Sequence, residues 1–232
     1  MKAVELSQEL LRAVKAGSAS MLLQQELAGK KPEELIAELK DPLSRKAFWI
    51  NTYNAFVQLS IEKHAPDLLN RKARIRFFSA RTISVSGIFL SLNNIEHGML
   101  RHSSVWWSLG YLQKLRVSNF EKKLRLPLDY RIHFALNCGA ASCPAIAFYE
   151  PGNLDEQLDN AMIAFLEGTV RFEARSKTVY LSPIFKWYYH DFGGRRGIIN
   201  LLWRLHLIPA DGKIRIRYSD YSWEMLARKF QQ

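Results

Sequence analysis

The first forty residues carry hydrophobic positions spaced three and four apart, which is the period of an amphipathic helix. The apolar side chains keep this spacing from residue 4 to residue 27, with one break of glycine and serine. Pro32, followed by two glutamates, is typical of the first turn of a second helix. This pattern predicts an N-terminal helical arm over residues 1–43, followed by one domain over residues 44–232.

Beyond the arm, helical and strand patterns are mixed without regular alternation, which favours an α+β fold. Helical spacing and capping residues predict helices at residues 44–64, 93–101, 153–167, 183–192, 196–207 and 221–230. Short alternating or continuous apolar runs predict strands at residues 74–78, 81–90, 133–136, 170–174, 178–181 and 213–218. No internal repeat or low-complexity linker divides this part of the chain.

The helix predicted at residues 44–64 places two amides among core-facing residues. Asn51 and Asn54 lie three positions apart and therefore share one face of the helix. A buried amide is costly unless it is hydrogen-bonded. The two asparagines are therefore either clamps on buried backbone or groups that orient a reacting residue.

The densest chemistry lies in HFALNCGAASCP, residues 133–144, which holds both cysteines together with His133 and Asn137. Cys138 follows the strand predicted at residues 133–136 and precedes a segment that could begin a helix. Backbone N–H groups and the helix dipole at such a position lower the pKa of a thiol. This layout is the one that a thiolate nucleophile needs.

Other roles for the cysteine pair have less support. A disulfide between residues five apart is conceivable, but a free thiol is the expected state in a reducing cytosol. A zinc site would need a second ligand pair, which CxxxxC lacks here. No GxGxxG motif or P-loop is present, so the sequence indicates neither a metal nor a cofactor.

The formal net charge is +11, and the basic residues gather at residues 71–81, 114–125 and 195–217. Such clusters attract nucleic acid, acidic lipid or an anionic substrate, although a merely well-solvated basic surface has the same composition. No run reaches the roughly 20 apolar residues of a membrane helix. The N-terminus carries glutamates where a signal peptide would be apolar, so a cytoplasmic location is expected.

Four motifs together resemble one family. They are WINTYNA at residues 49–55, NIEHGMLR at 94–101, HFALNCGAASCP at 133–144 and LSPIFKWYYHDFG at 181–193. In this order they are similar to the uncharacterised family of domains of unknown function numbered 547, over roughly residues 45–193. The resemblance implies a papain-like or permuted papain-like fold, with the cysteine, histidine and acidic residues of these motifs lining one cleft.

Nucleophilic cysteine catalysis needs a thiolate, a histidine within hydrogen-bond reach and a third group that orients the histidine. We expect Cys138 to attack, because Cys143 lies in the following segment. His97 is preferred over His133 as general base, since an offset of five residues along a strand sends His133 and Cys138 to opposite faces. Glu96 is the third candidate, although Arg101 or a backbone group could instead be its partner. The supporting candidates are His133, Asn137, Asn51, Asn54 and Arg101.

Three functions follow from these residues. The first is a cysteine hydrolase or acyltransferase that acts on an amide, ester or thioester of a small molecule, peptide or protein. The second is a catalytically inactive, hydrolase-like binding domain for an anionic partner, which would be nucleic acid, acidic lipid or protein. The third is a nucleic-acid or membrane-surface protein that binds through charge, for which binding should fall steeply with salt.

Overall fold

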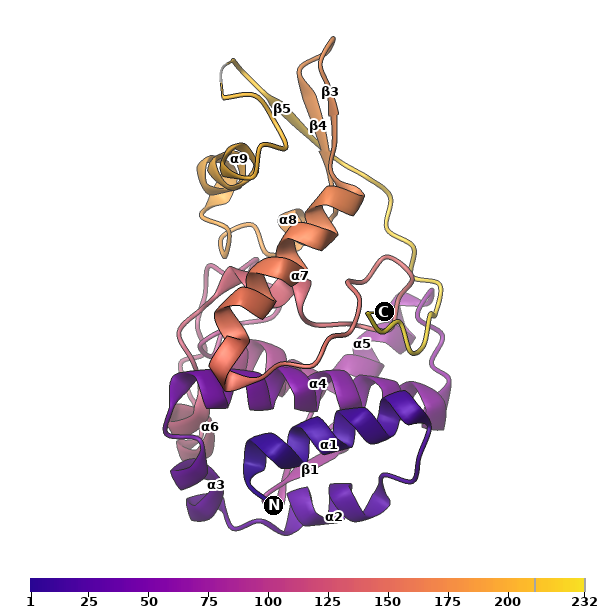
Figure 1. Ribbon diagram of the computed structural model, residues 1–232, viewed down its shortest axis with the longest axis vertical. Helices are drawn as coiled ribbons and strands as arrows, with labels where there is room; N and C mark the ends of the chain where they lie inside the picture. Colours follow the sequence, from indigo (N-terminus) through magenta and orange to yellow (C-terminus); the bar gives the residue numbers. More distant parts are fainter. Residues whose placement is uncertain (211, 232) are drawn as a thin grey trace.

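The computed structural model describes residues 1–210 and 212–231 and confirms an α+β fold (Figure 1). The helices of the first half are α1 (Ala3–Ala16), α2 (Met21–Gly29), α3 (Pro32–Glu38), α4 (Pro42–His64), α5 (Arg71–Ser79), the π-helix η1 (Asn94–Leu100) and α6 (Asn119–Leu124). They are followed by the 3₁₀ helices η2 (Tyr130–Phe134) and η3 (Pro151–Asn153), then by α7 (Leu154–Thr169), α8 (Ile184–Trp187) and α9 (Gly194–Arg204).

The strands are short and form two small sheets. β1 (Ile83–Val85) and β2 (Ile88–Leu90) make an antiparallel hairpin. β3 (Arg171–Glu173), β4 (Thr178–Leu181) and β5 (Arg215–Tyr218) make the second sheet, in which β4 pairs antiparallel with β3 and parallel with β5. In Figure 1 this second sheet and α9 lie at one end of the molecule, α1 to α4 lie at the other, and α7 runs between them.

Helix α4 is the central element of the N-terminal part. The Asp41 side chain caps it by accepting a hydrogen bond from Ser44 N at 2.7 Å, and Ala65 ends it in a left-handed conformation. α1 packs along α4 and buries Leu6, Leu10 and Leu11 completely. The first helix is therefore part of the main hydrophobic core, while the boundary at residue 43 stays a prediction.

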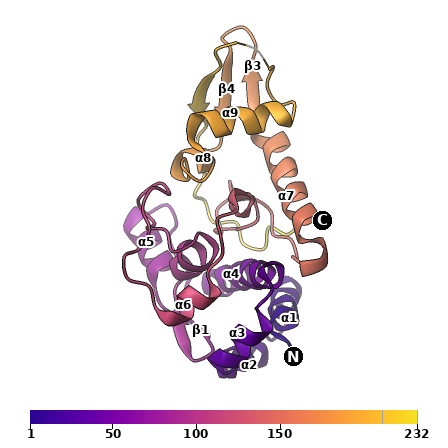
Figure 2. The ribbon, with the colours of Figure 1, turned by 90° about the vertical axis from the view of Figure 1, so that its left-hand side faces the viewer.

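Two hydrophobic cores meet at η2. Ile132 packs in the core built on α1 and α4, whereas Phe134 packs in the core beneath the second sheet, together with Phe185 and Phe192. His133 lies between these two residues and is buried. The short 3₁₀ helix thus directs its successive side chains to different cores and leaves the histidine at the junction between them. Figure 2 shows α1 to α4 at one end of the molecule and α8, α9, β3 and β4 at the other, with α7 running between them.

Several predicted elements are confirmed. The hairpin at residues 170–181, the edge strand near residue 215 and the helices around residues 44–64, 153–167 and 196–207 are all present. Residues 81–90 were predicted as a strand and form two short strands that pair with each other across a turn. The segment at residues 93–101 is helical, but as a π-helix.

Other predictions are wrong. Residues 74–78 lie in helix α5, because the Asn70 side chain caps this helix by accepting from Lys72 N and Ala73 N. Residues 133–136 are not a strand, since residue 134 ends the 3₁₀ helix η2. The aromatic helix expected from Pro183 is only the four-residue α8.

No helix forms at residues 221–230. Residues 219–231, which we call the strap, instead lie along the segment that carries both cysteines. We call that segment, residues 137–146, the cysteine loop. The strap is joined to the loop by backbone hydrogen bonds from Ala141 N to Glu224 O at 2.8 Å, from Leu226 N to Gly139 O at 2.8 Å and from Ile146 N to Lys229 O at 2.7 Å. Segments about 80 residues apart in sequence therefore build one side of a pocket.

Candidate functional site

A pocket of about 140 Å³ lies where the two cores meet. Its walls come from α4, η1, η2, the cysteine loop, α8 and the strap, and they include Tyr53, Glu96, His97, His133, Cys138 and Tyr221. The structure thus places the three predicted catalytic residues and the competing histidine around one space. No hydrogen bond joins a cysteine to a histidine among the described residues.

The two cysteines form a disulfide, so the expectation of free thiols is wrong. Cys138 is partly exposed and Cys143 is buried. The Tyr221 hydroxyl lies 3.4 Å from Cys138 Sγ and 3.2 Å from Cys143 Sγ, and Cys138 N donates to Cys143 Sγ at 3.0 Å. Cys138 can therefore act as a nucleophile only after reduction.

No helix dipole acts on Cys138, because residues 139–146 form turns and single β-bridges instead of the expected helix. In place of the dipole, individual donors surround the sulfur atoms. The Cys138 N–H and the Tyr221 hydroxyl both point to Cys143 Sγ. These donors would stabilise negative charge on Cys143 when the disulfide opens.

His97 is fixed as a hydrogen-bond donor toward the pocket. Arg101 Nη1 lies 2.7 Å from His97 Nδ1. A guanidinium has no acceptor, so Nδ1 accepts and the proton of the neutral ring sits on Nε2. Burial, opposed by Glu96, lowers the pKa of His97 to about 4, which keeps the ring neutral near pH 7. A general-base role for His97 would require this Arg101 hydrogen bond to break.

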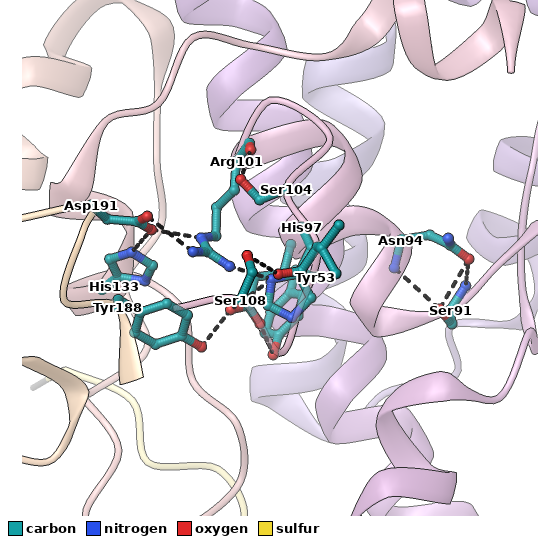
Figure 3. A network of polar contacts seen from close by, with 12 residues as sticks. Tyr53, Ser91, Asn94, His97, Arg101, Ser104, Ser108, His133, Tyr188 and Asp191 are labelled. Carbon is teal, nitrogen blue, oxygen red and sulfur yellow. Dashed lines mark hydrogen bonds and ion pairs between the residues drawn. The ribbon is translucent and has the colours of Figure 1, made fainter. Parts of the chain in front are cut away.

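His133 has the opposite arrangement (Figure 3). Its Nε2 donates to Asp191 Oδ2 at 2.8 Å, and burial lowers the pKa of the ring, an effect that Asp191 only partly offsets. Neutral His133 therefore keeps a lone pair on Nδ1, which accepts no hydrogen bond from a described residue. His133 lies in a 3₁₀ helix, so the alternation of side chains along a strand, which the sequence predicted, does not direct it away from Cys138.

Asp191 connects the two histidines through Arg101. Arg101 Nε donates to Asp191 Oδ2 at 2.6 Å and Nη2 donates to Oδ1 at 3.0 Å, in a bidentate pair that is almost fully buried. Burial raises the pKa of Asp191, but the hydrogen bonds from His133 and Arg101 outweigh it and lower the pKa to about 2. The carboxylate is thus charged at neutral pH, and its hydrogen bonds hold Arg101 and His133 in fixed positions.

Glu96 belongs to a separate part of the network. It accepts from Tyr188 Oη at 2.5 Å and from Tyr53 Oη at 3.3 Å. Its Oε1 lies 3.7 Å from His97 Nδ1, without a hydrogen bond between them. Burial opposes ionisation, yet His97, the Tyr188 hydroxyl and Arg101 together lower the pKa of Glu96. The partners of Glu96 are tyrosines, and Arg101 hydrogen-bonds elsewhere.

The π-helix η1 gives this wall its shape. Arg101 N donates to Glu96 O at 2.9 Å, which is the wider turn that defines a π-helix. At its start, Asn94 N donates to Ser91 Oγ at 3.1 Å and Asn94 Oδ1 accepts from Ser91 N at 3.0 Å (Figure 3). This reciprocal contact fixes the first turn from which His97 and Arg101 extend.

Asn51 and Asn54 are clamps on buried backbone, which is the first of the two roles that the sequence left open for them. Asn51 pairs with both the N–H and the carbonyl of Tyr149. Asn54 donates to Ala135 O and accepts from Asn137 N, each at 2.9 Å. Asn137 in turn donates to Pro144 O at 2.6 Å and accepts from Gly139 N at 2.8 Å, which closes the cysteine loop on itself.

Three residues of the site were not singled out from the sequence: Asp191, Tyr188 and Tyr221. Asp191 and Tyr188 both lie in LSPIFKWYYHDFG, whose spacing suggested only an aromatic helix. The available signal was the carboxylate itself, because an acid in such an apolar run needs a buried cation or hydrogen-bond donors.

Neither a metal site nor a membrane span is found in the part of the chain that the structure describes. No group of three or more histidine, cysteine, aspartate or glutamate side chains there has the arrangement of a metal site. Among residues 1–210 and 212–231, no helix combines the length and the apolar character that crossing a bilayer requires.

Comparison with known proteins identifies the family. A family profile described as a protein of unknown function, DUF547, matches residues 36–166, which is more than half of the chain. The chain belongs to the DUF547 family. The matched residues include Glu96, His97, His133 and Cys138, whereas the segment with Asp191 lies beyond them. Searches of curated proteins and of solved structures found no significant match.

Proposed function

We propose that this DUF547 protein is a hydrolase or acyltransferase in which the reduced Cys138 thiolate attacks the carbonyl carbon of an amide, ester or thioester. One observation carries the proposal: His133, which is hydrogen-bonded to Asp191 on one ring nitrogen, lines the same pocket as Cys138. An anionic partner on one ring nitrogen leaves the other nitrogen to take a proton, which is the arrangement of nucleophile-activating histidines.

The steps assign one role to each group. His133 Nδ1 takes the proton from the Cys138 thiol, the Sγ–C bond forms, and the carbonyl electrons move onto oxygen. His97 Nε2–H donates to that oxyanion. Protonated His133 then gives its proton to the leaving group as the C–N, C–O or C–S bond breaks. Water or an acceptor nucleophile, deprotonated by His133, releases the acyl group from Cys138.

Exposure and chain order support the choice of residues. Cys138 is the more accessible sulfur, and Cys143 is buried. The order along this chain is His133, Cys138, Asp191, whereas papain-like proteases have cysteine before histidine and asparagine. A permuted papain-like arrangement therefore forms part of the proposal.

The test compares oxidised and reduced protein with p-nitrophenyl acetate and a thiophenyl ester. Reduction should raise turnover at least about tenfold, since only a thiolate can attack. Cys138→Ser should abolish the gain. Cys143→Ser should keep activity and make it independent of reductant, because it cannot form the disulfide. Equal turnover by oxidised protein, or unchanged turnover by Cys138→Ser, would rule out the mechanism.

The disulfide itself favours a second candidate, a binding domain that performs no reaction, since it leaves no free thiol in the described structure. A basic helix, α5, offers a surface for an anionic partner. It buries none of its residues, and its exposed Arg71, Lys72 and Arg76 pair with no described carboxylate. For this candidate Cys138→Ser should leave function in cells intact, and charge reversal at these three residues should abolish it.

A further inference from the structure

The loop at residues 105–116, which we call the aromatic loop, exposes a cluster of large apolar side chains. They are Trp106, Trp107, Leu109, Tyr111, Leu112 and Leu115, and each exposes at least 42% of its surface, with Leu115 fully exposed. Single exposed apolar residues are common on proteins, but six within ten consecutive positions make a concentrated apolar surface. Such patches mark surfaces that contact another apolar phase or partner.

The aromatic loop has a defined structure. Val105 N donates to Leu112 O and Lys114 N donates to Ser103 O, both at 2.8 Å. The Ser108 hydroxyl donates to Val105 O at 2.8 Å and accepts from Leu112 N at 3.1 Å. The apolar side chains are therefore held outward by an ordered turn, so that little conformational entropy is lost when they are covered.

Backbone geometry and a contact with the site hold the tip of the loop. Leu109 and Gly110 both have left-handed backbones, with φ of 54° and 92°. For leucine this conformation is unfavourable, and it persists only where surrounding contacts impose it. Leu109 O accepts from His190 N at 3.1 Å, and the Tyr111 ring packs 4.5 Å from the His190 ring. The loop is thus attached next to Asp191.

The charge around the aromatic loop is positive. Arg116, Lys122 and Lys123 are exposed and pair with no described carboxylate. The one acid between residues 102 and 128 is Glu121, which is buried and bonded to Lys114 at 3.1 Å. Residues 102–128 therefore combine exposed tryptophan, tyrosine and leucine with unpaired cations and present no exposed anion.

We propose that the aromatic loop docks the protein onto the surface of an anionic lipid bilayer. Tryptophan and tyrosine favour the level of the lipid headgroups, leucines enter the acyl boundary, and lysine and arginine bind anionic headgroups. A protruding loop inserts into a fluid interface without a preformed complementary groove. Exposed leucines add nothing to phosphate binding, which makes nucleic acid a poorer match. The inference does not depend on catalysis by Cys138.

The test measures binding of the full chain to sedimented vesicles of phosphatidylcholine, with and without phosphatidylserine. Wild type should bind the mixed vesicles and bind pure phosphatidylcholine more weakly. Trp106→Ser with Trp107→Ser should weaken binding by at least about tenfold. Replacing Arg116, Lys122 and Lys123 by serine should weaken binding to the anionic vesicles on the order of a hundredfold, with little change for neutral ones.

Matched controls distinguish vesicle binding by the aromatic loop from nonspecific binding by other exposed apolar or basic side chains. Leu22→Ser on α2 removes an apolar side chain that is 80% exposed elsewhere, and replacing the exposed Lys31, Lys40 and Lys63 by serine removes three charges outside the aromatic loop. Both should leave vesicle binding within about twofold of wild type. Trp106→Phe with Trp107→Phe should keep binding but lose quenching of tryptophan fluorescence by brominated lipid, which reports insertion directly.

Three results would overturn the proposal. The first is failure of wild type to bind anionic vesicles at low salt. The second is binding that the Trp106→Ser, Trp107→Ser variant retains. The third is a dimer in solution that this variant dissociates while vesicle binding is absent, which would assign the aromatic loop to a second copy of the chain.

Discussion

The region around η1 and the region around η2 each bury a histidine in the wall of the same pocket, with opposite results. On η1 a cation, Arg101, donates to His97 Nδ1 and leaves an N–H free. On η2 an anion, Asp191, accepts from His133 Nε2 and leaves a lone pair free. Burial lowers the pKa of both rings. The charge of the partner, and not the residue type, decides which ring is a donor and which an acceptor.

The two regions are also one network, because Arg101 and Asp191 hold each other in a bidentate pair. Removing one partner should therefore alter both tautomers at once, whereas replacing one ring should alter only its own side. This difference makes the comparison testable.

The largest effect is expected from Asp191→Asn. The substitution leaves Arg101 as a buried charge without its carboxylate and removes the anion that orients His133. Loss of one member of a buried ion pair costs about 3–5 kcal/mol, which should appear as a lower urea midpoint at pH 7. Asp220→Asn, at an exposed position, is the control and should change stability by less than about 0.5 kcal/mol. A loss below 1 kcal/mol for Asp191→Asn would contradict a buried network.

The next largest effect is the loss of folding free energy at acid pH that is caused by protonation of His97. His97 has a folded pKa of about 4 against an ordinary value of 6.5, so the unfolded chain binds a proton more readily between these two values. Wild type should therefore lose stability as the pH falls from 6.5 to 4, by about 3 kcal/mol from this group.

His97→Gln removes that titration while its amide oxygen can still accept from Arg101. Urea unfolding at several pH values should show a shallower loss between pH 6.5 and 4 than in wild type. His64→Gln, on the exposed end of α4, should retain the wild-type slope. If the His97→Gln slope equals that of wild type, the neutral donor assigned to His97 is wrong.

The smallest effect separates the two rings by reactivity. After reduction, iodoacetamide should alkylate Cys138 at neutral pH, and His133→Ala should slow this reaction by about tenfold because the thiol loses its base. His97→Gln should change the rate by less than about twofold, since that ring donates and does not accept. Mass spectrometry of the labelled peptide distinguishes Cys138 from Cys143. The reverse order of the two variants would return the base role to His97.

Helix α4, the hairpin at residues 170–181 and the α+β class followed from local patterns, because their apolar spacing matches the burial that tertiary packing imposes. The same spacing marked Asn51 and Asn54 as buried amides that need hydrogen-bond partners, although it could not show that these partners are the distant carbonyls of Tyr149 and Ala135. Cys138, His97, Glu96 and His133, which were singled out from the family motifs, all line one pocket, while their catalytic roles stay predictions.

What failed depended on contacts between distant segments. His133 was placed on a strand, but the segment winds as a 3₁₀ helix because Ile132 and Phe134 enter different cores. The strap was predicted as a helix, yet its backbone pairs with residues 139–146, a partner that local spacing cannot reveal. Asp191 was missed because its cation, Arg101, lies 90 residues earlier in the chain.

The strap has a consequence for the order of folding. Its contacts with the cysteine loop join residues about 80 positions apart, and contacts of such long range form late. While the strap is undocked, the Tyr221 hydroxyl does not contact the sulfur atoms, and the cysteine loop does not have its backbone hydrogen bonds to the strap. The redox state of the surroundings at that stage therefore decides whether Cys138 and Cys143 are bonded or free. Docking of the strap then covers the two sulfur atoms in that state.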